Sequence, residues 1–310
     1  MDKPKHIHVH LDETIVVNNI DTFIRKVNDI FRLQQSKKKY VHYYLWKTNK
    51  IDFLGIVMLY KFLEYSVQNK CYLDPTIFLS KEVKSNIKLY RFHDLVSTLI
   101  EGNDIKSEFE KLKIEITNDF IIAPIAMWKE NILSKYQWNK KLLPDIQRYY
   151  PEDISLMVFQ LFIELYSNFV SHADDNSKSI MVAHGTKEWI EIVCVDNGIG
   201  IVESLRKVYP SMKSDQILRK AVCKCISSKK NEEHMGYGLW YINEIVKKIN
   251  GRMEIWSNDA HYKCLGHNIT SNSSSYWQGT IIYLKLKLTK AILLHEIENN
   301  DILNNLVNFK

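Results

Sequence analysis

The residues best suited to chemistry lie in the C-terminal half, and the first group falls on an apolar segment with helical spacing. Glu164 and Asn168 are four residues apart, so both project from one face of that helix. A carboxylate and a carboxamide on one face suit a site in which the amide holds a magnesium ion and the carboxylate polarises a water molecule. A solvated polar helix face is the alternative interpretation.

The second group follows an apolar segment that is typical of a strand. Asp196 ends this segment, and Gly198 and Gly200 come directly after it. A carboxylate at a strand end can accept a hydrogen bond from an exocyclic amine, while the glycines let the backbone turn away from the ligand. An ordinary turn with the same residues remains open.

Two further glycine groups complete the set. Gly236 and Gly238, followed by Leu239, open a predicted helix, where free backbone N–H groups and the helix dipole favour phosphate. Lys229 and Lys230 precede them on a charged segment, which suggests a lid that closes over phosphates. The last group is Asn250-Gly251 followed by Gly279-Thr280, and each of these pairs is an unremarkable turn by itself.

Taken in order, E-x-x-x-N, D-x-G-x-G, G-x-G-L, N-G and G-T resemble the motifs of the GHKL ATP-binding superfamily over about residues 150–288. This superfamily includes histidine kinases, anti-sigma-factor kinases, gyrase B, MutL and the ninety-kilodalton chaperones. The resemblance implies a Bergerat-type α/β sandwich that binds ATP and Mg²⁺. It also implies roles for individual residues: Glu164 as general base, Asn168 as magnesium ligand, Asp196 as acceptor of the adenine amino group with Thr280 beside it, Gly198 and Gly200 as the adenine pocket, and Lys229, Gly236, Gly238 and Leu239 around the phosphates. His172 shares the helix face and is interpreted as a structural neighbour.

The elements that must position these groups can be read from the spacing of apolar residues. Pro151, Glu152 and Asp153 favour a helix start, and the helix should run to about Ala173. The remaining expected elements are strands at 179–183, 189–195, 252–257 and 280–288, a charged, partly helical lid at 202–235, a helix at 239–250, a polar loop at 258–278 and a terminal helix at 291–308.

The N-terminal half reads as a small α/β domain with alternating strands and helices. Strands are expected at 6–17, 41–46 and 77–79, with helices at 56–67 and 80–89. His6, His8 and His10 would share one strand face, which we interpret as exposed rather than as a metal site. Residues 105–150 are less readable, with a helix expected at 127–138.

Residues 40–97 resemble a STAS domain, the anti-sigma-antagonist fold. The likeness rests on the segment from Asn49 to Glu64 and on the strand and charged helix after it. STAS phosphoacceptors carry a serine just before the glycine at the helix start, whereas Phe53 and Leu54 precede Gly55 here. The resemblance therefore implies an interaction or dimerisation module rather than a phosphorylated switch.

These observations give an expected organisation of an α/β protein: a STAS-like domain at 1–104, a helical connector at 105–150, a GHKL ATP-binding domain at 151–290 and a C-terminal helix at 291–310. The composition agrees with a globular protein. The 310 residues carry a net charge of +6 and only ten glycines, which excludes fibrous and low-complexity classes. Six of those glycines fall in the motifs above.

Location and partners are inferred from what the sequence lacks. It has five scattered cysteines, no secretory signal and no apolar segment long enough for a membrane helix, so a cytoplasmic protein without a membrane partner is expected. Cys223 and Cys225 have the wrong spacing for a zinc knuckle. The mild, interleaved charge disfavours a nucleic-acid partner without excluding one.

The resemblance leaves several activities open. The favoured one is a regulatory ATPase in which ATP and Mg²⁺ order the lid and so control either a protein partner, such as a STAS-type or signalling protein, or a second copy of the chain. A protein-serine kinase of the anti-sigma-factor type is the alternative, and a nucleotide-gated binding module without turnover is a third. A histidine kinase is disfavoured, because His93-Asp94 lacks the helical hairpin that a phosphoacceptor histidine needs.

Overall fold

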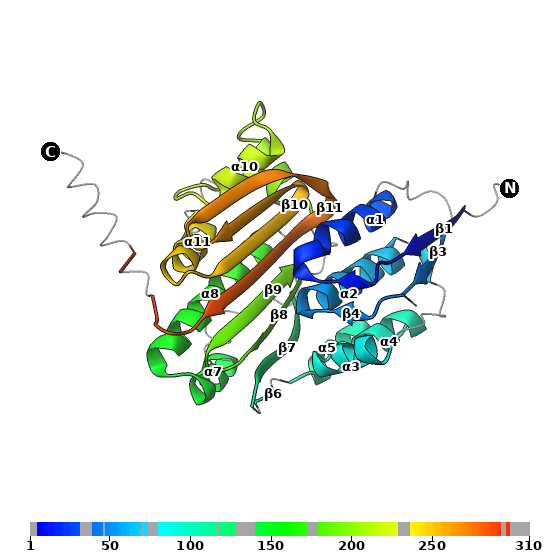
Figure 1. Ribbon diagram of the computed structural model, residues 1–310, viewed down its shortest axis with the longest axis horizontal. Helices are drawn as coiled ribbons and strands as arrows, with labels where there is room; N and C mark the ends of the chain where they lie inside the picture. Colours follow the sequence, from blue (N-terminus) through cyan, green and yellow to red (C-terminus); the bar gives the residue numbers. More distant parts are fainter. Residues whose placement is uncertain are drawn as a thin grey trace.

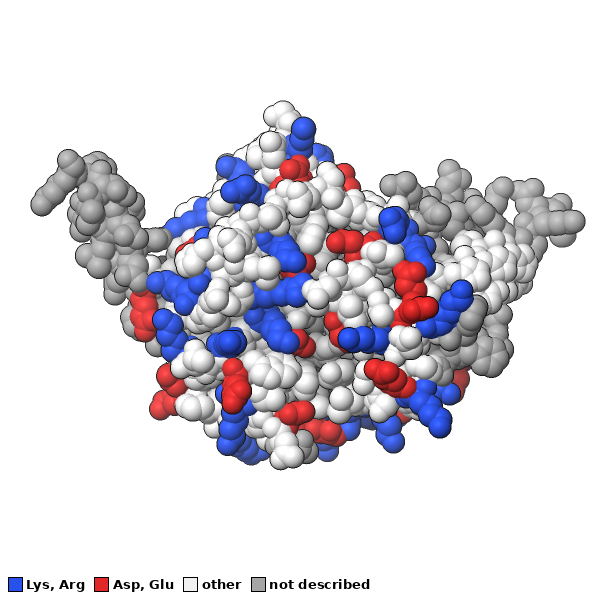
Figure 2. All heavy atoms as spheres, viewed as in Figure 1, with Lys and Arg blue, Asp and Glu red and all other residues white. Residues whose placement is uncertain are grey.

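The structure is a computed structural model, and it describes residues 5–31, 39–45, 47–69, 71–73, 80–113, 115–116, 118–127, 140–172, 179–228, 236–292 and 296–297. Among these residues, no helix has the length and apolar character needed to cross a membrane. Basic and acidic side chains are interspersed on the face of the molecule drawn in Figure 2.

A six-stranded antiparallel sheet forms the centre of the C-terminal half (Figure 1). Its strand order is β10-β11-β9-β8-β7-β6. The strands are β6 (Glu115–Ile116), β7 (Phe120–Met127), β8 (Ser179–Gly185), β9 (Trp189–Val195), β10 (Arg252–Leu265) and β11 (Asn268–Lys287). The helices of this half are α7 (Leu143–Tyr149), α8 (Glu152–His172), α9 (Ile201–Arg206), α10 (Ser214–Ala221) and α11 (Gly238–Lys248).

One face of this sheet, which we call the inner face, packs against α8, α10 and α11. The longest of these helices, α8, begins with Glu152 and Asp153 at the positive end of its dipole, as the sequence predicts. Its apolar side is buried at Phe159, Phe162, Leu165 and Phe169. This packing fixes the rotation of α8 and places Glu164 and Asn168 in half-buried positions.

Two predictions for this half are wrong. Residues 258–278 are not a polar loop, because β10 and β11 pair continuously through most of that segment. The exposed serines and asparagines there are held by backbone pairing, so no apolar pattern marks the strands. Residues 105–150 are not a helical connector throughout, because β6 and β7 lie between α5 and α7 and extend the sheet. Three predicted elements lie wholly or mostly outside the described residues. They are the helix at 127–138, the strand at 77–79 and the terminal helix at 291–308.

The N-terminal half is a βαβ arrangement with parallel strands. β1 (Lys5–His10), β3 (Lys39–Tyr44) and β5 (Cys71–Leu73) form one sheet in that order, and β2 (Thr14–Ile15) pairs with β4 (Lys50–Ile51). The helical elements are the short 3-10 helix η1 (Val17–Asn19), α1 (Ile20–Phe31), α2 (Phe53–Gln68), α3 (Lys81–Leu89), α4 (His93–Glu101) and α5 (Ile105–Lys111). The expected alternation of strands and helices is present; a separate domain of STAS type stays a prediction.

The second face of the six-stranded sheet, the outer face, is covered by this N-terminal half. α1 lies across β11 and α2 lies against β9 (Figure 1). The two halves share one hydrophobic core, to which the sheet contributes Ile180, Val182, Val193, Val195, Trp256, Trp277, Ile281 and Tyr283. α2 buries most of its length, including the charged residues Lys61 and Glu64. The central strands β8 and β9 are therefore covered on both faces.

Candidate functional site

The first and third motifs meet at the start of α11. A Cβ placed on Gly238 would lie 2.8 Å from Oε2 of Glu164 and 2.9 Å from Nδ2 of Asn168. The other carboxylate oxygen of Glu164 accepts a hydrogen bond of 2.6 Å from Nε2 of Gln160, one turn earlier on α8. Any larger residue at 238 would displace these two side chains, so the glycine is needed to keep Glu164 and Asn168 in these positions.

The carboxamide of Asn168 is incompletely bonded. Its Nδ2 is buried and has no hydrogen-bond partner among the described residues. Rotation of the amide by half a turn exchanges nitrogen and oxygen within the same outline, so the position suits a ligand for either atom. A buried polar group without a partner is unfavourable by about 1–3 kcal/mol. Asn168 is therefore placed to bind something that completes its bonding, and amide oxygen is a preferred ligand of Mg²⁺.

Asp196 directly follows β9 in a buried position. Its Oδ1 accepts a hydrogen bond of 2.6 Å from the backbone N–H of Gly198, and its own N–H donates to the carbonyl of Thr280 at 2.9 Å. Burial raises the pKa of Asp196 to about 6, although these backbone contacts and the charge of Lys61 oppose the rise. At neutral pH the side chain is a largely ionised carboxylate in a mostly water-free environment, which strongly favours a hydrogen-bond donor as partner.

The strand beside Asp196 is irregular, and this irregularity shapes the site. Thr280 pairs with Ser257, but Trp277 pairs with Asn258, so residues 278 and 279 form a bulge in β11. Gly279 in this bulge has φ +102°, and a Cβ on it would lie 2.4 Å from the carbonyl oxygen of Asp196. Glycine at 279 thus allows β11 to touch the strand end that carries the carboxylate.

Ser257 and Asn258 are two site residues that the sequence analysis missed. Oγ of Ser257 accepts from the N–H of Ile201 at 2.8 Å and lies 3.3 Å from Oγ1 of Thr280. Nδ2 of Asn258 donates to the carbonyl of Ile199 at 3.0 Å. Both side chains hold the loop that carries Gly198 and Gly200. Only their place at the predicted end of a strand could have indicated them.

Two further motif glycines have backbone conformations and close contacts that a side chain would disturb. Gly200 has φ +82°, and a Cβ there would lie 2.3 Å from Oδ1 of Asn258. Gly236 has φ +73°, and a Cβ there would lie 2.5 Å from the carbonyl oxygen of Ile226. The first turn of α11, which holds Gly238 and Leu239, has no side-chain cap from Tyr237 before it. Its N–H groups are thus available to an anion.

The other residues singled out in the sequence are either outside the described residues or exposed. Lys229 and Lys230 lie outside the described residues, as does the side chain of His172. His93 is exposed, and its Nδ1 lies 3.3 Å from Oδ1 of its neighbour Asp94. Cys223 and Cys225 are exposed and free, and no cluster of three potential metal ligands occurs among the described residues.

The strand face with the three N-terminal histidines is exposed, as expected. His6, His8 and His10 stack in turn with rings from β3, at centroid distances between 4.4 and 5.9 Å.

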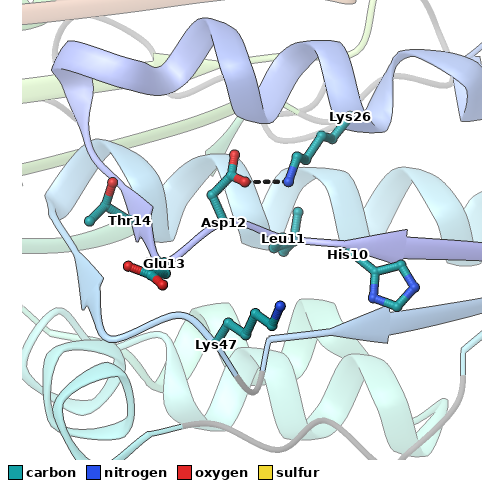
Figure 3. A pocket seen from close by; sticks show the side chains of 7 residues that line it. All are labelled: His10, Leu11, Asp12, Glu13, Thr14, Lys26 and Lys47. Carbon is teal, nitrogen blue, oxygen red and sulfur yellow. Dashed lines mark hydrogen bonds and ion pairs between the residues drawn. The ribbon is translucent and has the colours of Figure 1, made fainter.

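A separate hollow of about 460 Å³ lies where β1 and β3 part (Figure 3). Asp12 is ion-paired with Lys26 of α1 across it. Its walls are His10, Leu11, Asp12, Glu13, Thr14, Lys26 and Lys47. None of the motif residues contributes to this hollow, so it is distinct from the site between α8, α11 and β9.

Comparison with known proteins agrees with the geometry of that site. Searches of the curated proteins and of the solved structures found no match to the chain. Residues 153–290, which contain α8, β8–β11 and the helices between them, match the family model described as "Histidine kinase-, DNA gyrase B-, and HSP90-like ATPase". This part of the chain therefore matches a GHKL-type ATPase domain, and ATP binding is expected of such a domain.

Proposed function

We propose that this protein is a regulatory ATPase that binds ATP with Mg²⁺ between α8, α11 and the end of β9. The observation that carries the proposal is the approach of Gly238 to Glu164 and Asn168. It brings a carboxylate, an incompletely bonded amide and the N-terminus of a helix to one place.

Each group has a role that its surroundings support. The Asp196 carboxylate accepts a hydrogen bond from the adenine amino group, and the N–H groups at the start of α11 bind phosphate oxygens. The amide oxygen of Asn168 is the protein ligand for Mg²⁺, which when bound neutralises phosphate charge and orients the terminal phosphoryl group. Glu164 lies beside Asn168, with one oxygen fixed by Gln160, and orients the attacking water. The expected phosphate contact of Lys229 remains part of the proposal.

The regulatory part of the proposal rests on how the domain is connected. The segment at 202–235 lies between the adenine side and the phosphate side of the site in the sequence, and it contains α9 and α10. The N-terminal half contacts the opposite face of the same sheet. Ordering of this segment by ATP would therefore act on a body that is already packed against the N-terminal half, or on a protein partner bound there.

The test is the variant Glu164→Ala, with Glu244→Ala as its control. Glu244 is a carboxylate on α11 that pairs with Lys247 instead of facing Asn168. Phosphate release should fall by about 100-fold or more in Glu164→Ala. Its calorimetric affinity for ADP with Mg²⁺ should stay near the wild-type value, and Glu244→Ala should resemble the wild type in both. Equal phosphate release in Glu164→Ala and wild type would contradict the catalytic assignment.

Labelled ATP separates this function from its alternatives. With γ-labelled ATP, a regulatory ATPase releases the label as inorganic phosphate. Label that appears instead on a STAS-type protein would identify a protein-serine kinase. Nucleotide binding with neither product would identify a gated binding module.

A further inference from the structure

Three consecutive residues of β11, numbered 276–278, hold the loop that begins with Asp196. We call them the β11 clasp. Nε1 of Trp277 donates to the carbonyl of Asp196 at 3.1 Å, and Nε2 of Gln278 donates to the carbonyl of Gly198 at 2.9 Å. Between them, Nδ2 of Asn197 donates to the carbonyl of Gln278 at 3.2 Å. Each residue of the segment 196–198 is thus tied to the clasp.

Two features orient the side chains of the clasp. The hydroxyl of Tyr276 donates to Oε1 of Gln278 at 2.7 Å, which fixes the direction of the amide. The clasp also borders the bulge at Gly279, where β11 leaves its regular register with β10. Bulges turn side chains away from the usual alternation, and here this brings Trp277 and Gln278 to the same loop.

The indole of Trp277 also contacts the N-terminal half. It is fully buried, and its ring meets Phe31 at the end of α1 edge-on, at a centroid distance of 5.0 Å. Phe31 in turn packs against Phe62 and Tyr65 of α2, at 6.1 and 4.7 Å. One side chain therefore joins the aromatic residues of α1 and α2 to the backbone of Asp196.

We infer that Trp277 and Gln278 are positioning residues for base recognition, which hold the carboxylate of Asp196 where it meets the exocyclic amine of an adenine nucleotide and link its position to α1 and α2. The inference rests on the proposed ATP site. Asp196 stands at the end of a strand and before a glycine-rich loop, where the backbone is free to rotate unless it is tied. A recognition group must keep its position to within about 0.5 Å, and two hydrogen bonds to the flanking carbonyls provide that constraint.

A purely structural role makes a different prediction, and Trp256 supplies the matched control. Trp256 is also buried, and its Nε1 donates across the same interface, to Oδ1 of Asp21 on α1 at 2.7 Å. It has no hydrogen bond to the segment 196–198. Trp277→Phe and Trp256→Phe each remove an indole N–H donor and keep an aromatic ring at the interface between the sheet and α1, so Trp256→Phe reports what the loss of an interface indole does without any contact to the segment 196–198.

The experiment measures the affinities of the full chain for ADP and for GDP by calorimetry, with Mg²⁺. Guanine lacks the exocyclic amine of adenine at the matching position, so GDP reports on phosphate binding. Trp277→Phe should weaken ADP binding about tenfold, the equivalent of one lost hydrogen bond, and leave GDP binding unchanged. Trp256→Phe should leave the ADP-to-GDP ratio within about twofold of the wild type.

Two outcomes would overturn the inference: an unchanged ratio in Trp277→Phe, or an equal fall in Trp256→Phe. Gln278→Leu provides a second variant if Trp277→Phe does not fold, because Gln278 is only partly buried. It should lower the same ratio, because it removes the hydrogen bond to the carbonyl of Gly198. Failure of the proposed ATP site is distinguishable from both, since the wild type itself would then bind no ADP.

Discussion

The inner and outer faces of the six-stranded sheet are covered in different ways. On the inner face, α8 and α11 approach so closely that Gly238 touches Glu164 and Asn168, and an amide nitrogen there has no partner among the described residues. On the outer face, the indole nitrogen of the buried Trp256 donates to the exposed carboxylate of Asp21 on α1, and within α2 the buried Lys61 binds the buried Glu64. The inner face leaves bonding capacity beside the motif residues, whereas the outer face carries the apolar core that joins the N-terminal half to the sheet.

The largest expected effect tests the outer face. Lys61 and Glu64 are 1% and 2% exposed. Lys61→Met leaves the carboxylate of Glu64 buried beside the hydroxyl of Tyr60 without its cation, which should lower the free energy of unfolding by about 3–5 kcal/mol. Urea denaturation measures this loss. The double variant Lys61→Met/Glu64→Leu should recover most of it, and failure to recover would show that the pair does more than neutralise charge.

The second prediction compares one glycine from each side of the sheet. A Cβ on Gly238 meets the ends of two side chains, which can move, whereas a Cβ on Gly55 would lie 2.2 Å from the backbone oxygen of Ile15, which cannot. Gly238→Ala should reduce phosphate release by about 100-fold through displacement of Glu164 and Asn168, with little change in melting temperature. Gly55→Ala should instead lower stability by about 1–3 kcal/mol and retain nucleotide binding where folded.

Parallel melting curves and phosphate-release assays check this pair. The distinction between the faces would fail if Gly238→Ala melted as early as Gly55→Ala, or if Gly55→Ala lost activity while it remained folded.

The smallest expected effect concerns pH. Because the pKa of Asp196 is raised by burial to about 6, its ionised fraction falls from about nine-tenths at pH 7 to about one-tenth at pH 5. Calorimetry should show ADP affinity falling about tenfold over that range. Asp196→Asn serves as the control, because its remaining pH dependence reports the titration of the phosphates alone. Identical profiles for both proteins would remove Asp196 from base recognition.

The stability of the nucleotide-free protein should change with pH in the opposite direction. The folded pKa of Asp196 lies above its ordinary value of 3.8, so ionisation of this group opposes folding. Its favourable contribution is complete below about pH 4 and is lost as the pH rises through about 6.

Sequence reasoning succeeded where local pattern determines the structure. The spacing of Glu164 and Asn168, the acidic start of α8 and the order of the glycine motifs predicted the ATPase domain. It failed where tertiary pairing decides: the hairpin of β10 and β11 has polar residues that favour a loop, and Ser257 and Asn258 acquire their roles only through the bulge at Gly279. The packing of α1 and α2 on the outer face could not be predicted from local sequence, because apolar residues in a helix or strand do not indicate which other element they contact.

The shared core also has a consequence for how the protein is made. α2 is complete once residue 68 has been synthesised, but the sheet that covers it needs β8, β9 and β11, the last of which ends at Lys287. A ribosome adds about 5–20 residues per second, so the apolar surface of α2 waits roughly ten seconds or more for its cover. During that interval the N-terminal half exposes an apolar helix surface to other nascent chains, and a fragment ending before β8 should be aggregation-prone and bind chaperones.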